Sequence, residues 1–425
     1  MTTRSKIRAY ARRQGVLQPQ SWLGECPPGA PSTSSRLSLF RAAMVSLASL
    51  GFSPLAWPAA SDAALACAPV ARFASDASVD RHARWLAGIA GETPSLELSE
   101  HPAQLERSFA RLEARQMRRV RAWSAAELPI EVHAADTLYY PFSGPDVVYP
   151  AALFPRATRM LFTGLEPVGS PPSEADFAQD KLGDSLAEVR RSLATLLGQS
   201  FFVTAQMQQQ FARNRFRGVT PILMLLLARS GYQIDQVVGV VLAADGRLCA
   251  RDFGDRADNA GVEIRYHKPG EKQLRTLVYL RVDLSNDGLA AAPGYARFVR
   301  QAYVAASYLK SASYLMHTRE FSAIRDLLLE VSPALLQDDS GIPLREFPDT
   351  RWQPTFYGRY QAAASGFGGH SQPDLRLAFA SAAPAALPFW IGYRHSPADS
   401  NLQLYRRRLG DTDTGTSTST GPAHH

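Results

Sequence analysis

The stretch TLYYPFSGPDVVYPAALFPRATRMLFTGLE, residues 137–166, decides the fold class. It opens with an apolar run at 137–140, passes through a turn rich in proline and small residues, and ends on a second apolar run at 160–163. The residues between these runs, 151–154, have helical composition. A strand, a helix and a second strand in this order predict two parallel strands of one sheet, joined by a crossover helix.

The same unit resembles, in its layout, the first strand–helix–strand unit of the Rossmann-type folds that bind nucleotides or methyl donors. In those folds a turn of small residues brings backbone amides to the ligand, and an acid about 20 residues later binds a ribose hydroxyl. The resemblance implies a ligand site formed by Ser143, Gly144, Asp146 and Glu166. The dinucleotide motif has three glycines where this stretch has one, and Pro145 lacks an amide hydrogen, so a turn shaped only by packing is the alternative.

Helices are expected where apolar residues recur with a period near 3.6. Residues 103–123 form such a helix, and its polar face carries a row of arginines that we interpret as a solvated face: Arg107, Arg111, Arg115 and Arg118. Another helix is predicted after Ser173, with Asp176 completing a capping box at its start. Further helices are expected at 205–213, 220–228, 295–306 and, with Thr318 as its cap, 320–331.

Strands are expected where β-branched and apolar residues run together or alternate. Residues 236–242 end in a hairpin signal at 244–246, and 262–267 is a further strand. In 274–284 apolar and polar residues alternate, which predicts one solvated face and therefore antiparallel strands added to a parallel sheet. With a last strand at 388–393, we predict a three-layer α/β fold: a mixed sheet with a parallel Rossmann-like portion, added antiparallel strands and helices on both faces.

The N-terminal region has the order of a secretory signal. Residues 42–61 carry no charge, follow Arg36 and Arg41, and precede the small residues 64–66. We therefore expect an exported protein, periplasmic or membrane-anchored on the extracytoplasmic side. The predicted parts are a targeting segment at 1–66, one α/β domain at 67–408 and a disordered tail at 409–425. A retained membrane anchor and an extension without a targeting role are the alternatives.

Charge and cysteine content limit the partners. The net charge is +7, but residues 1–66 hold seven basic and two acidic groups, so the rest of the chain carries only about +2. A body this close to neutral does not favour a nucleic-acid partner. Membrane contact is expected only through the N-terminal segment or through lipid on Cys67, which could instead pair with Cys249 or stay free. The sequence assigns no cofactor and no oligomeric state.

Two further groups of residues could carry chemistry. Asp338 and Asp339 are adjacent carboxylates in a loop, where they could bind a divalent ion or one could act as a general acid, although a solvated turn gives the same pattern. His317 ends a predicted strand at 314–317 and could join Ser143 and an aspartate in a hydrolytic triad; a structural histidine is the alternative.

Three functions therefore remain open: a small-molecule cleft near Ser143 and Gly144, an envelope hydrolase that uses Ser143 or the aspartates with His317, and a non-catalytic protein that binds a glycan or a partner. The third would use aromatic residues that core packing also explains: Trp352, Phe356, Tyr357, Tyr360, Phe389, Trp390 and Tyr393. The sequence does not decide whether the protein is an enzyme.

Overall fold

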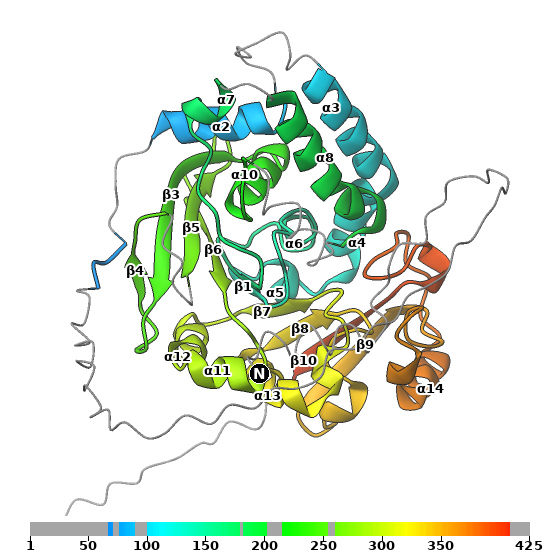
Figure 1. The fold of residues 1–425 in the computed structure, drawn as a ribbon. Coiled ribbons are helices and arrows are strands. Elements are labelled where there is room, and N and C mark those ends of the chain that lie inside the picture. The colour runs from blue at the N-terminus through cyan, green and yellow to red at the C-terminus, as the bar shows by residue number, and fades with distance from the viewer. Residues whose placement is uncertain are drawn as a thin grey trace, which may run out of the picture. The chain divides into compact units, whose positions relative to one another are not determined.

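The computed structural model describes residues 67–70, 76–89, 100–178, 182–201, 215–253 and 260–408. The predicted targeting segment 1–66, the tail 409–425 and the predicted helix 205–213 lie outside these residues. The described chain forms one sheet with helices on both faces (Figure 1). The α/β fold predicted from the sequence is therefore confirmed.

The sheet has ten strands in the order β4-β3-β5-β6-β2-β1-β7-β8-β10-β9. Their bounds are β1 Thr137–Tyr140, β2 Arg159–Gly164, β3 Gln233–Leu242, β4 Leu248–Ala250, β5 Ala260–His267, β6 Arg275–Arg281, β7 Ala306–Leu309, β8 Ala334–Gln337, β9 Trp352–Gly358 and β10 Asn401–Arg407. The five central strands, β6-β2-β1-β7-β8, pair in parallel. Antiparallel strands extend the sheet at both sides.

The parallel strands have the order of a doubly wound fold. Numbered along the chain, they lie in the order 3-2-1-4-5, and the direction of winding reverses between β1 and β7. The carboxyl ends of strands at such a switch point are where open α/β sheets bind ligands. The fold thus singles out the loops that follow β1 and β7.

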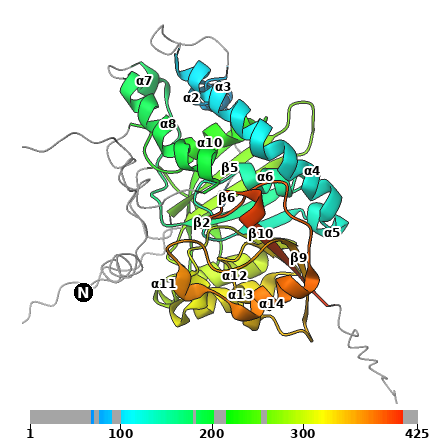
Figure 2. The ribbon, with the colours of Figure 1, turned by 90° about the vertical axis from the view of Figure 1, so that its right-hand side faces the viewer.

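Helices cover both faces of the sheet (Figure 2). One face packs against α2 Ala77–Leu86, α3 Glu100–Leu112, α4 Arg118–Glu127, α6 Val148–Leu153, α8 Leu182–Gln199 and α10 Thr220–Arg229. The other packs against α11 Asn286–Ala291, α12 Gly294–Gln301 and α13 Ser322–Val331. The central strands bury side chains on both faces: in β1, Leu138 and Tyr140 enter one core and Tyr139 the other. Continuous apolar runs at β1 and β2 follow from this double burial.

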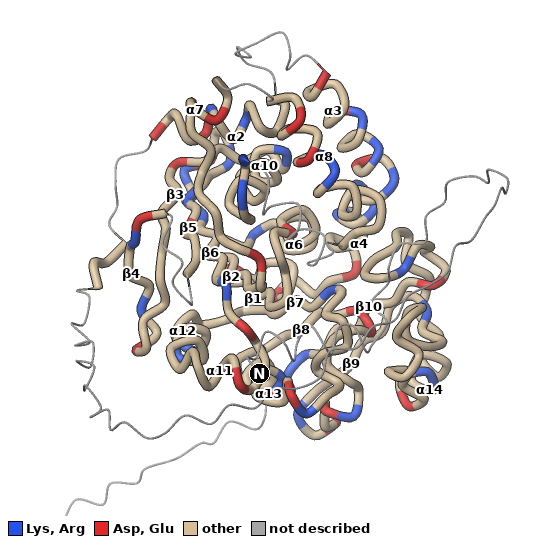
Figure 3. The backbone as a smooth tube through the Cα atoms, in the orientation of Figure 1, with Lys and Arg blue, Asp and Glu red and all other residues tan. Residues whose placement is uncertain are grey.

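Several local predictions are confirmed. The helix predicted at 103–123 is present as α3 and α4, joined by a π-helical turn at Glu113–Met117. Its arginine row is exposed, as a solvated face requires (Figure 3). The capping box of Ser173 and Asp176 is present at α7 Glu174–Phe177. Gly246 closes the β3–β4 hairpin with a φ of +89°, a value that favours glycine.

Other local predictions are wrong. The solvated face of 274–284 is absent, because β6 lies inside the sheet and buries Arg275 and Tyr279. Residues 315–317 form a 3₁₀ turn and not a strand, and 388–393 has no strand. The helix predicted at 295–306 is shorter, because α12 ends at Gln301 and β7 begins at Ala306. The helix predicted at 320–331 begins at Ser322, and no side chain caps its start.

Cys67 forms a disulfide with Cys249 of β4, one of the three states that the sequence leaves open. The disulfide and a single β-bridge between Pro69 and Cys249 hold residues 67–70 against the edge of the sheet. Among the helices of the described residues, none combines the length and the hydropathy that a membrane span requires.

Candidate functional site

Charged and polar side chains collect at the carboxyl ends of four parallel strands. Ser143, Gly144 and Asp146 follow β1, and Glu166 follows β2. Lys310 and Ser311 follow β7, and Asp338 and Asp339 follow β8. Because β1, β2, β7 and β8 are parallel, these residues share one edge of the sheet, beside the switch point. The sequence-predicted residues from both halves of the chain therefore lie at the same edge.

A buried ion pair joins the tips of β1 and β7. Lys310 Nζ lies 2.5 Å from Asp146 Oδ2, and the two side chains are 1% and 2% exposed. The phenol of Tyr140 donates a hydrogen bond to the same carboxylate oxygen at 3.2 Å. Lys310 also donates to the carbonyl of Ser200 and lies 3.8 Å above the centre of the Tyr149 ring. Burial lowers the pKa of Lys310, against the attraction of Asp146.

Asp338 lies next to this pair, at the tip of β8. Its Oδ2 accepts the backbone N–H of Ser311 at 2.9 Å, and its Oδ1 accepts the N–H and the hydroxyl of Ser340 at 3.0 and 2.5 Å. Burial, followed by the charge of Asp339, raises the pKa of Asp338 to about 6. A carboxyl group with this pKa can exchange a proton near neutral pH.

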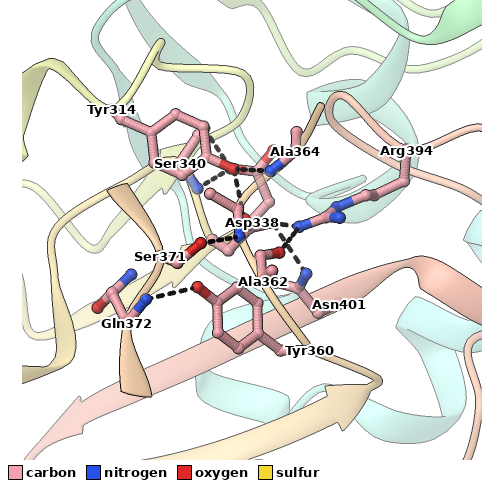
Figure 4. Close-up of polar contacts among 12 residues, drawn as sticks. Tyr314, Asp338, Ser340, Tyr360, Ala362, Ala364, Ser371, Gln372, Arg394 and Asn401 are labelled. Atoms are coloured by element: carbon pink, nitrogen blue, oxygen red, sulfur yellow. Dashed lines mark hydrogen bonds and ion pairs between the residues drawn. The ribbon is translucent and has the colours of Figure 1, made fainter. Parts of the chain in front are cut away.

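Asp339 is the centre of a second network, whose members Tyr314, Arg394 and Asn401 are labelled in Figure 4. Its Oδ2 accepts from the Tyr314 hydroxyl at 2.5 Å and from Arg394 Nη2 at 2.7 Å, while its Oδ1 accepts from Asn401 Nδ2 at 2.9 Å. Tyr314 in turn accepts the N–H of Ala364, and Arg394 donates to the carbonyl of residue 362. Asp339 therefore fixes the loop after β9 as well as the tip of β8.

Gly144 and Glu166 are adjacent, as the Rossmann-like layout implies. A Cβ atom on Gly144 would lie 3.8 Å from Glu166 Oε1. Glu166 is 1% exposed, and the Tyr279 hydroxyl donates to its Oε2 at 3.1 Å. The carboxylate thus lies buried beside the glycine turn, where its charge would repel a phosphate group.

Ser143 and His317 are not brought together by any hydrogen bond among the described residues. Ser143 Oγ exchanges hydrogen bonds with the backbone of Thr163, at 3.3 and 3.2 Å. His317 packs against Tyr314 and His370, with ring centres 5.2 and 5.4 Å away. Among the described residues its Nε2 is buried without a hydrogen-bond partner, and burial lowers the pKa of His317 to about 3. This geometry gives no support to a triad of Ser143 and His317.

The backbone around this edge is strained. Seven described residues other than glycine have a φ in the left-handed region, and five of them, with φ between 54° and 68°, lie around this edge: Phe142, Ser200, Ser311, Ser313 and Tyr314. They belong to the loops after β1 and β7 and to the end of α8, whose Ser200 binds Lys310. Each such residue costs on the order of 1–3 kcal/mol and tends to occur at functional sites.

Sequence reasoning missed Lys310, Ser311, Tyr314 and Arg394. Lys310 directly follows β7, so its position after a buried strand was the available signal, but no strand was predicted at 306–309. Arg394 had no such signal, because it meets Asp339 only through the tertiary fold.

A separate cavity of about 700 Å³ lies between α4, β9 and the segment after α14 Pro373–Ala382. Its walls include Trp123, Phe356 and Tyr357, and Glu127 is the one carboxylate among its described lining residues. A cavity so poor in titratable groups offers little acid–base chemistry, so the carboxyl edge of the sheet remains the better candidate. In the described part of the chain, no three histidine, cysteine, aspartate or glutamate residues gather as a metal site.

Comparison with protein-family models, with curated proteins and with solved structures gave no match to this chain.

Proposed function

We propose that this protein is exported and binds a small polar molecule at the carboxyl edge of β1, β7 and β8, in a Rossmann-like cleft beside the Ser143–Gly144 turn. The observation that carries the proposal is the coincidence of strain and buried charge at the switch point. Asp146, Lys310, Asp338 and Asp339 are each at most 4% exposed. Buried charges and serines with a left-handed backbone conformation both reduce the stability of the fold. Their presence together at one edge of the sheet is therefore explained better by a bound ligand than by folding alone.

The ligand of this proposal carries no phosphate. Glu166 lies beside the glycine turn, and Asp338 and Asp339 add further negative charge to the same edge. Pro145 removes one of the amides that would hold a phosphate. These features favour a neutral or hydroxylated molecule over a nucleotide.

Export is supported by two independent features. Residues 42–61 are uncharged and end close to the small residues 64–66, and Cys67, the next residue, forms a disulfide with Cys249. Disulfides persist in oxidising compartments and are rare in the cytosol. A sulfur atom in a disulfide cannot also carry a lipid, so we propose a protein released after cleavage and not a lipoprotein.

The binding proposal is tested by thermal unfolding of the purified protein in the presence of a library of small metabolites. At least one compound should raise the melting temperature, because a ligand that binds only the folded state stabilises it. Ser311→Ala should abolish that shift while leaving the unliganded protein stable, since Ser311 Oγ has no hydrogen-bond partner among the described residues.

The matched control is Ser108→Ala on α3, which should keep the shift. A library without any stabilising compound, or an equal shift in Ser311→Ala, would overturn the binding proposal. Export is tested separately, by fractionation and N-terminal sequencing of the mature chain. A new N-terminus at or shortly before Cys67 in the extracytoplasmic fraction supports it, and an uncleaved cytoplasmic product contradicts it.

A further inference from the structure

A cluster of aromatic rings covers the outer side of the Asp339 network. Phe367 lies with its ring centre 4.9 Å from that of Tyr314 and 5.1 Å from that of Tyr393. Tyr314 and Tyr393 are almost parallel, with an interplanar angle of 16° and ring centres 6.5 Å apart. His370 stacks on Tyr314 at 5.4 Å. Phe367 therefore covers the rings of two tyrosines whose hydroxyls reach the polar edge of the sheet.

Phe367 is carried by a glycine-rich segment. We call residues 365–370 the flap; its sequence is SGFGGH. Gly366, with a φ of +89°, precedes Phe367, and a Cβ on Gly368 or on Gly369 would meet no atom within 4 Å. Among the described residues, the backbone hydrogen bonds of the flap are local: Phe367 donates to the carbonyl of residue 364, His370 to that of Phe367, and Ser371 to that of Gly368.

The two ends of the flap are fixed. The N–H of Ala364 donates to the Tyr314 hydroxyl at 2.8 Å, and Ala363 donates to Ser371 Oγ at 3.1 Å. Behind them, Gln372 donates to the Tyr360 hydroxyl at 2.8 Å (Figure 4). A segment with glycines in its middle and hydrogen bonds at its ends can swing without disturbing the Asp339 network.

Polar atoms without partners belong to the residues near the flap. Ser311 Oγ, His317 Nε2 and Arg394 Nε are buried and make no hydrogen bond within the described chain. The set contains a hydroxyl, an imidazole nitrogen and an obligate donor. A ligand with several hydroxyl groups can donate to some of these atoms and accept from others. A carboxylate or phosphate can only accept, and Asp338 and Asp339 would repel it.

We infer that the flap gates a site for a monosaccharide ring, in which Phe367 occupies the place of the sugar when the flap is closed. The flat face of a pyranose stacks on the tyrosine rings that Phe367 now covers, as apolar ring faces do on aromatics. Its hydroxyls bond Ser311, His317 and Arg394. This inference rests on the proposed function, because it names the class of small molecule that the same edge binds.

The test measures the binding of D-glucose, D-galactose and N-acetylglucosamine by calorimetry at millimolar concentration. At least one sugar should bind, and Phe367→Ala should bind it about tenfold more tightly, because the closed flap lowers the fraction of competent molecules. Tyr393→Ala should lose the binding. Phe356→Ala, the same change on β9, is the control and should leave the affinity unchanged.

Two results would overturn the inference: no sugar bound by either the wild-type protein or Phe367→Ala, or an affinity that Phe367→Ala leaves equal or weaker. These outcomes differ from a failure of the proposed function. Suppose that a metabolite stabilises the wild-type protein but not Ser311→Ala, and that no sugar binds. The proposed binding site would then stand, and only the inference of a saccharide ligand gated by the flap would be wrong.

Discussion

Lys310 and Asp146 form an ion pair of 2.5 Å between two strands that neighbour each other in space but are far apart in the chain. The pair joins β7 to β1 across the switch point of the sheet. Removing two charges from water is unfavourable, and their attraction offsets this only where hydrogen bonds satisfy the remaining atoms. Tyr140 and the carbonyl of Ser200 supply such bonds here. The pair is consequently sensitive to loss of either partner.

Lys310→Met should lower the free energy of unfolding by about 3–5 kcal/mol, because it leaves Asp146 buried and unpaired. The double variant Lys310→Met with Asp146→Leu should recover at least half of that loss. Urea unfolding gives both values. Arg300→Met is the control: its partner Glu330 is 51% exposed, so this change should cost no more than about 1 kcal/mol. Equal losses of unfolding free energy in Lys310→Met and Arg300→Met would show that Lys310 does not compensate the buried charge of Asp146.

The stability should depend on pH through Asp338. Its pKa rises from 3.8 to about 6 on folding, so between these values the folded state binds more protons than the unfolded state. The contribution of Asp338 to the free energy of unfolding therefore decreases by about 3 kcal/mol as the pH rises through that window. Above the window this contribution no longer changes with pH.

Asp338→Asn should remove this fall. We expect the stability difference between variant and wild type to change by about 3 kcal/mol from pH 4 to pH 7 in urea unfolding. Asp326→Asn removes a carboxylate that is 73% exposed and should leave the wild-type profile intact. A profile for Asp338→Asn that runs parallel to the wild type would show that Asp338 is not the titrating group.

The fold was predictable where a strand is buried on both faces. β1 and β2 are short apolar runs between turn residues, and the Rossmann-like order follows from them. β9 and β10 gave no such signal. Pro354 interrupts β9, which is compatible with an edge strand only, and β10 buries the polar residues Asn401 and Gln403. Burial of polar side chains removes the alternation on which strand prediction depends.

The candidate site was predictable in part, for a related reason. Asp146, Glu166 and Asp338 follow strands, and parallel strands bring their carboxyl ends to one edge. The partners of these acids, Lys310 and Arg394, come from distant parts of the chain. A pairing between residues so far apart depends on the finished sheet, and no local pattern encodes it.

Reduction of the disulfide should destabilise the protein. The bond between Cys67 and Cys249 closes a loop with a sequence separation of 182, and removal of a native disulfide typically costs about 2–5 kcal/mol. Cys249→Ser should unfold at a correspondingly lower urea concentration, and a reducing agent should bring the wild-type protein to the same midpoint. Cys67→Ser removes the same bond from its other end and should unfold at the same midpoint as Cys249→Ser. Two free thiols in the native protein under non-reducing conditions would contradict the bond.

Gly392 should be far less tolerant of substitution than another glycine with the same backbone conformation. Gly392 has a φ of +66°, and a Cβ there would lie 2.0 Å from Asp338 Oδ2. Gly231 has a φ of +83° but no atom within 4 Å of the same position. Gly231→Ala should therefore show only the backbone strain, on the order of 1 kcal/mol.

Gly392→Ala adds a steric clash that pushes the Asp338 carboxylate away from the Ser311 and Ser340 amides. Because those hydrogen bonds satisfy a buried carboxylate, we expect a loss of at least about 3 kcal/mol in the same urea assay. The pH-dependent fall assigned to Asp338 should change as well, since the environment of the carboxyl group is altered. Similar losses of unfolding free energy for Gly392→Ala and Gly231→Ala would mean that a side chain at position 392 does not clash with Asp338.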